Sequence, residues 1–438
     1  MKIRHLKLDH FRRFDSFEID FHEQLTVLVA RNGAGKTSIL DALAIALGPF
    51  LTRLPNVSGK NPKDSDFQVY PNKLKPPFMR IQCQSFNELR WDRTEKRDQT
   101  KKTASHIPEA LGIKQLTDYA DSMVDAFNDN SAFALPLFAY YGTGRGVFDV
   151  PQRKRGFGKE FPRFEALSES LESRTNFKRF VEYFYALEDI ELKSQRDAKS
   201  FELEIPELKA IREAIHRMLP EFSNPRGAEP AGIAVDWNCD GTLKELRIEQ
   251  LSDGYRITLA MVMDIAARMA EANPDIERSG LNNSLDTEGV ILIDEVDLHL
   301  HPGWQQTILL DLQRTFPNIQ FIVTTHSPQV ISSVKPKCLR VIEWHDEQPS
   351  LHLVEFSEGA ESQRMLLDVL GVESSRVEQL DIVQKLKRYQ QLVFQDQWDS
   401  DEAQQLHREL RDWGQEYEPE LLRLDMDVRM KEWERTHE

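Results

Sequence analysis

The stretch that most constrains the fold of this chain is Ala30–Thr37, which follows the pattern G-x-x-x-x-G-K-[ST] with alanine in place of the first glycine. The apolar run Leu25–Val29 before it predicts a buried strand, and the leucines after it predict a helix from Lys36 to Leu47 that Gly48-Pro49 ends. In this context small residues let backbone N–H groups turn towards a phosphate, and the helix N-terminus adds its dipole. The sequence therefore predicts a nucleotide-phosphate site formed by Asn32, Gly33, Ala34, Gly35, Lys36, Thr37 and Ser38.

A second apolar run, Val290–Ile293, ends in two adjacent carboxylates, Asp294 and Glu295. At such a site Lys36 would contact the β- and γ-phosphates, and Thr37 and Asp294 would hold a Mg²⁺ ion. Glu295 would polarise the attacking water as a general base. More than half of the chain separates this pair from the phosphate loop, which requires a large insertion between the two halves of one nucleotide domain.

Composition limits the classes of protein that this chain can belong to. It has 438 residues, of which 40% are hydrophobic and 29% charged, which is typical of globular proteins with two or three folding units. A net charge of −16 argues against binding to polyanions through bulk charge. Any nucleic-acid contact would need a local basic patch, and the candidate residues are Arg153, Lys154, Arg155, Lys159 and Arg163. A solvated loop is the alternative interpretation of that stretch.

The three cysteines, Cys83, Cys239 and Cys338, are far apart and form no C-x-x-C pair, so we expect neither a disulfide framework nor a zinc knuckle. No apolar run reaches the length of a membrane span, and the first residues lack the apolar core of a signal peptide. We therefore expect a cytoplasmic protein that does not contact a membrane.

Alternating strand and helix patterns in the second half of the chain predict a parallel sheet. We expect a hairpin over 231–250 with its turn at Asp240-Gly241, and strands at 290–293 and 321–325. Earlier in the chain, residues 78–86 and 135–141 are strand-like, and the charge-rich stretch 90–102 indicates an exposed loop. The expected helices cover 174–198, 206–219, 253–272 and 303–315, with a helical pair broken near 396–401 in the acidic tail.

Leu251-Ser-Asp-Gly-Tyr255 opens the helix that begins at residue 253, and here the chain resembles the ABC-type ATPases, whose signature reads LSGGQ or a variant. Ser252 and Gly254 at a helix N-terminus would form an anion site. A plain serine N-cap is the alternative. The position of this segment ahead of Asp294, in the order found in that family, favours the signature.

The segment that follows Glu295 has two interpretations. Asp297, His299 and His301, with the two preceding carboxylates, could form a metal cluster. The resemblance instead implies that Asp297 belongs to the D-loop that crosses a dimer interface, because DLHLHP is a form seen in SMC-like and OLD-like ATPases. The two histidines would then be structural.

His326, in Thr-Thr-His-Ser-Pro, matches the switch histidine of ABC-type ATPases, which contacts the γ-phosphate; a hydrogen-bonded core histidine is the alternative. No glutamine-loop residue is evident, although Gln82 and Gln84 are candidates. The resemblance therefore implies an α/β fold: an ABC-type P-loop ATPase head, with a mixed or parallel sheet and flanking helices. Residues 1–90 and 230–360 would form its two halves, 91–229 a mostly helical insertion, and 361–438 a C-terminal helical tail.

The same resemblance implies ATP and Mg²⁺ as cofactors and a head-to-tail homodimer, in which Ser252 and Gly254 of one chain close the site of the other. Tyr140–Arg145 and Gly359–Gly371 are similar to the ATPase subunit of Septu and Septu-carrying retron systems of anti-phage defence. That similarity implies a separate nuclease partner such as an HNH protein, or a retron reverse transcriptase complex. Without that similarity, the simplest interpretation of Arg145 is a solvated cation in a loop.

Other function classes remain open from the residues alone. A RecF-like or SMC-like DNA-repair ATPase would need basic surfaces and long heptads. An OLD-type nuclease would need a Toprim domain, and only Asp425 and Asp427 suggest one. A transporter ATPase would have its signature and carboxylate pair closer together, without this insertion. A scaffold that binds ATP without hydrolysing it is the last alternative.

Overall fold

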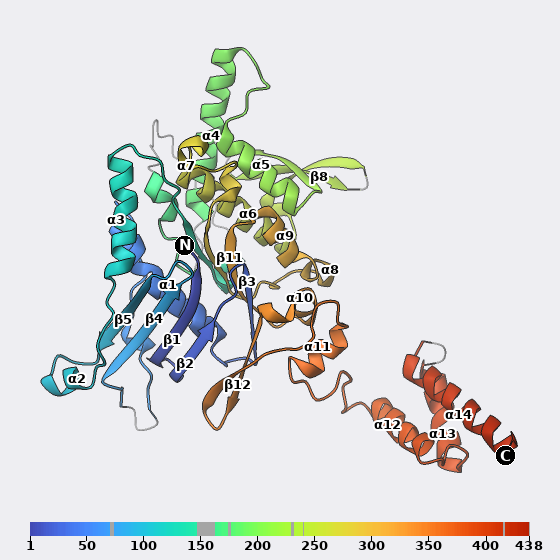
Figure 1. Cartoon of the computed structure of the whole chain (residues 1–438). Helices are drawn as coiled ribbons and strands as arrows, with labels where there is room; N and C mark the ends of the chain where they lie inside the picture. Colours follow the sequence, from blue (N-terminus) through green and yellow to red (C-terminus); the bar gives the residue numbers. More distant parts are fainter. Residues whose placement is uncertain are drawn as a thin grey trace. The chain divides into compact units, whose positions relative to one another are not determined.

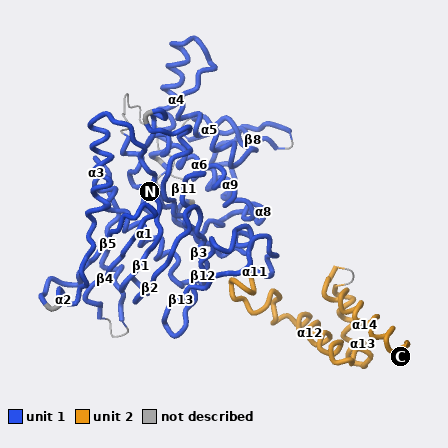
Figure 2. Tube along the Cα trace, in the orientation of Figure 1, with its two compact units in different colours: residues 1–365 blue, residues 366–438 orange. Residues whose placement is uncertain are grey.

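The computed structural model describes residues 1–70, 74–146, 163–173, 177–228, 232–239, 241–414 and 417–437. It contains two compact units, Met1–Met365 and Leu366–Glu438 (Figure 2). Among the described helices, none combines the length and apolar character needed to span a bilayer.

The first unit is built on a six-stranded sheet of order β13-β12-β3-β11-β10-β6. Figure 1 labels three of its strands, β12, β3 and β11. Every neighbouring pair is parallel except β12 and β13, which form an antiparallel hairpin at one edge. The sheet is thus mixed and mainly parallel, as expected. Its strands are β3 (Leu25–Ala30), β6 (Leu137–Tyr141), β10 (Gly289–Ile293), β11 (Ile319–Thr325), β12 (Leu339–His345) and β13 (Gln348–His352).

Helix α1 (Lys36–Arg53) packs against both this sheet and a second, antiparallel sheet of order β2-β1-β4-β5. The strands of that sheet are β1 (Ile3–Phe11), β2 (Phe14–Asp20), β4 (Phe78–Ser85) and β5 (Arg90–Lys96). The expected exposed loop at 90–102 is wrong for its first half, because Trp91 is fully buried in β5 and buried Asp92 pairs with Arg80. Charge density misled the prediction, since the Asp92 charge is buried and neutralised by Arg80 of the neighbouring strand β4.

The expected end of α1 at Gly48-Pro49 is also wrong, since the helix continues to Arg53. A proline inside a helix costs about 3 kcal/mol. Here Phe50 and Leu51, beyond the proline, are fully buried, and their burial offsets that cost. Gly48 serves close packing instead, because a Cβ there would lie 2.2 Å from the carbonyl oxygen of Lys60.

Helix α6 (Asp253–Ala272) begins and ends where the sequence predicted and packs against α4, α5 and β6. The predicted hairpin is β8 and β9, although Asp240 of its turn lies outside the described residues. The predicted helix at 303–315 is divided into α8 and α9. The remaining elements of this unit are α2 (Lys101–Ser105), α3 (Lys114–Asn128), α4 (Phe177–Ala198), α5 (Pro206–Met218), β7 (Phe222–Gly227), β8 (Ile233–Cys239), β9 (Thr242–Arg247), α7 (Ile276–Ser279), α8 (Pro302–Gln305), α9 (Ile308–Thr315) and α10 (Pro328–Ser332).

Strand β6 lies within the segment expected to be an insertion, yet it forms an edge of the six-stranded sheet beside β10. The head therefore draws a strand from residues 91–229. The proposed domain boundaries otherwise stay a prediction.

The second unit is a helical bundle. The expected break near 396–401 is confirmed, but three helices pack around its core rather than two. Its buried side chains include Leu392, Leu410 and Leu421. The helices are α12 (Asp381–Phe394), α13 (Asp401–Gly414) and α14 (Pro419–His437), preceded by α11 (Ser362–Asp368), which spans the boundary between the units.

Candidate nucleotide site at the ends of β3, β10 and β11

The predicted phosphate loop connects β3 to α1. Ala30 is the last residue of β3 and pairs with Ile342, an extended position that does not need glycine. Gly33 and Gly35 have positive φ values of 74° and 100°, which glycine adopts without strain. Gly35 also faces the ring of Phe14, which a Cβ would approach to 2.5 Å. Within the loop, Asn32 and Gly33 are exposed, Ala34 is buried, and Ser38 is half-buried on α1.

The parallel sheet brings the predicted carboxylate pair to this loop. The Thr37 hydroxyl donates to Oδ2 of Asp294 at 2.8 Å, and the Thr324 hydroxyl donates to Oδ1 at 2.7 Å. Thr324 also accepts a 2.7 Å hydrogen bond from the backbone N–H of Glu295. Asp294 is buried and Glu295 half-buried. A hydroxyl and a carboxylate in contact are the oxygen ligands that Mg²⁺ prefers, so Thr37 and Asp294 fit that ion.

Lys36 and His326 meet at the same place. The Lys36 ammonium lies 2.8 Å from Nε2 of His326 and donates to the carbonyl of Ala30 at 2.9 Å. Burial lowers the pKa of Lys36, against the opposing effect of the nearby carboxylates. Burial and the Lys36 charge also lower the pKa of His326, which favours a neutral imidazole that accepts from the lysine. These groups would contact a γ-phosphate.

The predicted signature segment lies at the start of α6. Ser252 occupies the N-cap position, but its side chain makes no capping hydrogen bond, which weakens the plain N-cap alternative. Ser252 is exposed. Gly254 is buried against the segment that follows Glu295, because a Cβ there would lie 2.5 Å from the carbonyl oxygen of His299.

In the segment after Glu295, Asp297 accepts a 2.5 Å hydrogen bond from Thr325. His301 caps α8 by accepting from the N–H of Gly303, a structural role. Within the described residues, metal-ligating side-chain atoms converge at the exposed Glu343, His345 and His352 instead of here. The geometry thus gives no support to a metal cluster after Asp294.

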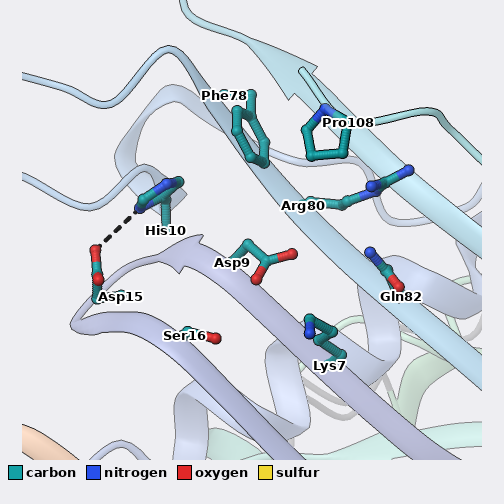
Figure 3. Close-up of a pocket in the computed structure, with 9 residues that line it drawn as sticks. All are labelled: Lys7, Asp9, His10, Asp15, Ser16, Phe78, Arg80, Gln82 and Pro108. Carbon is teal, nitrogen blue, oxygen red and sulfur yellow. Dashed lines mark hydrogen bonds and ion pairs between the residues drawn. The ribbon is translucent and has the colours of Figure 1, made fainter. Parts of the chain in front are cut away.

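The two glutamine-loop candidates lie on β4. Gln82 lines a polar cavity of about 410 Å³ over β1 and β4, together with Lys7, Asp9 and Arg80 (Figure 3). Gln84 donates to Glu88 at 2.8 Å. None of the residues that line this cavity belongs to the phosphate loop or to the carboxylate pair.

Some residues at the site belong to none of the sequence motifs. The indole N–H of Trp344 donates to the carbonyl of Ala34 at 2.9 Å, and the Arg13 guanidinium lies 3.6 Å from the Trp344 ring centroid. Arg13 also donates to the carbonyl of Gly33. The parallel pairing of β12 with β3 brings Trp344 here, and no local signal in the sequence shows that pairing.

Two arginines differ from their sequence interpretations. Arg145 is not a solvated loop cation, because it is 2% exposed and donates to the backbone carbonyls of Asp294 and Glu295. Arg163 stacks on Phe133 and donates to the carbonyl of Ala272, so it belongs to the packed structure. The other residues of the predicted basic stretch lie outside the described residues.

Comparisons with known proteins give a family and several relatives for this chain. A family model described as an AAA domain matches residues 5–223. The Retron Ec83 probable ATPase of Escherichia coli is 28% identical, over 99% of this chain and 88% of its own. The Septu protein PtuA of Bacillus mycoides (strain KBAB4) is 43% identical over 82 residues, 19% of this chain and 10% of its own. Among solved structures, an SMC head bound to the C-winged helix domain of ScpA matches 81% of this chain and 98% of its own. The identity is 13% and the TM-score is 0.44.

Proposed function

Because the chain belongs to the AAA-domain family, which implies ATP binding, we propose that it is an ATP-hydrolysing sensor and regulator of a partner nuclease in bacterial anti-phage defence. The observation that carries the ATPase part is the hydrogen bond between Thr37 and Asp294. It joins the phosphate loop to a carboxylate that is 257 residues distant in the chain. Lys36 contacts His326, and the charge of Glu295 acts on both. This set of groups is typical of phosphoryl transfer to water.

Each residue has a specific chemical role in this proposal. Thr37 and Asp294 would hold Mg²⁺, which would supply positive charge beside the phosphates. Glu295 accepts a proton from water as the water oxygen bonds to the γ-phosphorus. The bond from that phosphorus to the β–γ bridging oxygen breaks, and the products are ADP and inorganic phosphate. Lys36 and the neutral His326 stabilise the charge on the γ-phosphate oxygens.

A second copy of the chain completes the site. The exposed Ser252 at the N-terminus of α6 has a hydroxyl that caps nothing, and Gly254 follows it in the first turn. Helix N-termini favour anions, so this corner suits the γ-phosphate bound by a partner chain. ATP then holds a head-to-tail dimer together, and Asp297 lies in the D-loop at its interface. Hydrolysis of ATP loosens the dimer.

The defence role rests on the relatives. One is named a retron probable ATPase and covers nearly the whole chain, and another is a Septu protein. We propose that the nucleotide state of the dimer controls a separate nuclease subunit such as an HNH protein, alone or within a retron reverse transcriptase complex. We place this assembly in the cytoplasm, where the three cysteines stay reduced. Contact with nucleic acid through Arg153, Lys154, Arg155 and Lys159 stays a prediction.

Lys36→Ala tests the nucleotide site. The variant should lose ATP binding measured by calorimetry, because a buried ammonium that would contact the phosphates is removed. Lys193→Ala, at an exposed position of α4, is the matched control and should bind ATP like the wild type. Unchanged ATP affinity in Lys36→Ala would refute the assignment of the site.

The partner is tested by co-expression with the products of the neighbouring genes, among which we expect a nuclease. Wild type and Glu295→Gln should co-purify with the nuclease, and ATP should change the nuclease activity of the complex. A nuclease that neither binds the ATPase nor responds to ATP would refute the regulatory role and leave the ATPase assignment intact.

A further inference from the structure

Arg145 is a buried cation that is bonded to backbone carbonyls. It follows β6, and its guanidinium donates to the carbonyl of Gly142 at 3.0 Å, of Asp294 at 2.5 Å and of Glu295 at 2.6 Å. Only 2% of its surface is exposed. One planar group thus spans the two successive peptide units of the carboxylate pair, which the fork of an arginine can do and a lysine ammonium cannot.

Stability does not explain this arrangement, because burying the Arg145 charge costs free energy of folding. Burial lowers the pKa of Arg145 to about 10, and its Nε is buried without a hydrogen-bond partner. The charges of Asp294, Asp297 and Glu295 lie near enough to oppose that shift, although none of the described hydrogen bonds joins a carboxylate to Arg145. A buried charge with one unsatisfied donor destabilises the folded chain, which is a reason to look for a role other than stability here.

The feature that Arg145 contacts is the strained backbone of Glu295. Its φ is +50°, a left-handed conformation that costs a non-glycine residue of the order of 1–3 kcal/mol. Both sides of the residue are fixed, because its N–H donates to Thr324 and its carbonyl accepts from Arg145. Strain of this kind persists where surrounding contacts over-determine the backbone, and it directs where the side chain points.

We propose that Arg145 is a positioning residue for ATP hydrolysis. It holds Glu295 in the left-handed conformation and thereby orients the carboxylate towards the attacking water. The inference rests on the general-base role proposed for Glu295. Arg145 itself contacts neither the phosphates nor the water.

The test compares kcat, KM and ATP affinity in Arg145→Lys, Arg145→Gln, Glu295→Gln and the double variant Arg145→Lys/Glu295→Gln. Both Arg145 variants should keep ATP affinity and KM near wild type and lose about 100-fold in kcat, since a displacement of about 1 Å has that effect. The double variant should be no slower than Glu295→Gln, because residues that act through one group are not additive.

Arg268→Lys is the matched control. Arg268 is also buried, donates to the backbone carbonyls of Ala166 and Ser168, and pairs with Asp264. Its substitution should lower the melting temperature and leave kcat unchanged. A purely structural Arg145 would behave in the same way.

The outcomes separate the two proposals. If Glu295→Gln hydrolyses ATP at the wild-type rate, the role of Glu295 fails. If Glu295→Gln is inactive while both Arg145 variants keep the wild-type kcat, only the positioning role fails. If both Arg145 variants fail to fold, Arg145 is a fold-stabilising residue and the positioning role is refuted. An additive loss in the double variant refutes it as well.

Discussion

The side-chain nitrogens of Lys36 and His326 lie 2.8 Å apart, although 290 residues separate them in the chain. Lys36 begins α1 after β3, and His326 follows β11, which pairs in parallel with β3. The carboxyl ends of parallel neighbours meet at one edge of a sheet, so this contact follows directly from the topology. A buried ammonium beside an imidazole is unfavourable when both are charged, and an added phosphate anion relieves that repulsion.

The first prediction concerns pH. The pKa of His326 lies below its ordinary value through burial and the Lys36 charge, so the unfolded chain takes up this proton at a higher pH than the folded chain. Below about pH 6.5 the ATP-free protein therefore loses stability as pH falls. Scanning calorimetry should show a steeper fall in melting temperature between about pH 7 and 5 for wild type than for His326→Asn. Equal slopes would contradict the assigned contact.

The second prediction concerns Gly35, where φ is +100° and a Cβ would press on the Phe14 ring. Gly35→Ala should weaken ATP binding at least about tenfold, because the backbone N–H groups of the loop are displaced. Gly280→Ala is the control: φ there is +66° and the space around it is open, so this substitution adds backbone strain without a steric clash. Gly280→Ala should lower stability by about 1 kcal/mol and leave ATP affinity unchanged. Equal ATP affinities in the two variants would argue against the phosphate loop.

The third prediction concerns Mg²⁺. Thr37→Ala removes the hydroxyl that contacts Asp294, whereas Thr37→Ser keeps it. The alanine variant should need about 10–100-fold more Mg²⁺ for half-maximal ATP hydrolysis, and the serine variant should stay close to wild type. Titration of hydrolysis rate against free Mg²⁺ measures this. The same requirement in both variants would exclude Thr37 as a ligand.

The fourth prediction concerns the composite site. Lys36→Ala and Ser252→Arg chains should each be inactive alone, because every site in either homodimer lacks one essential half. A mixed dimer contains one intact site. The Ser252→Arg chain supplies its phosphate loop, and the Lys36→Ala chain supplies Ser252 and Gly254. Mixing should therefore restore part of the ATPase activity, and Glu295→Gln should trap a dimer with ATP in native mass measurements. No recovery on mixing, with ATP-bound monomers only, would refute the dimer.

The fifth prediction concerns the second unit. Leu410 is fully buried among the helices of the bundle, so Leu410→Ala should destabilise that unit by about 2–5 kcal/mol. Since the nucleotide site lies wholly in the first unit, ATP affinity should be unchanged. Calorimetry should show one shifted transition and one that is not. Leu406→Ala, at the half-buried edge of the same core, should lower the melting temperature of the second unit by less than Leu410→Ala does.

Local patterns in the sequence were sufficient for most of the elements that carry the site. The apolar runs before Ala30, Asp294 and His326 became buried parallel strands, and α6 has the predicted bounds. These patterns succeed because a strand buried on both faces must be continuously apolar. The errors have local causes too. In β5 the buried Asp92 is paired with Arg80 of β4, and α1 continues through Pro49 because the residues beyond it are buried.

The sequence by itself determined the chemical groups: a phosphate loop, a carboxylate pair, a serine–glycine corner and a histidine, in one order along the chain. Only the tertiary structure decided which other residues join them. Trp344 reaches the loop through the pairing of β12 with β3, and Arg145 reaches Glu295 through the pairing of β6 with β10. Motif residues are recognisable because their chemistry fixes their spacing. Supporting residues are held by long-range strand pairing, which leaves no fixed spacing in the sequence.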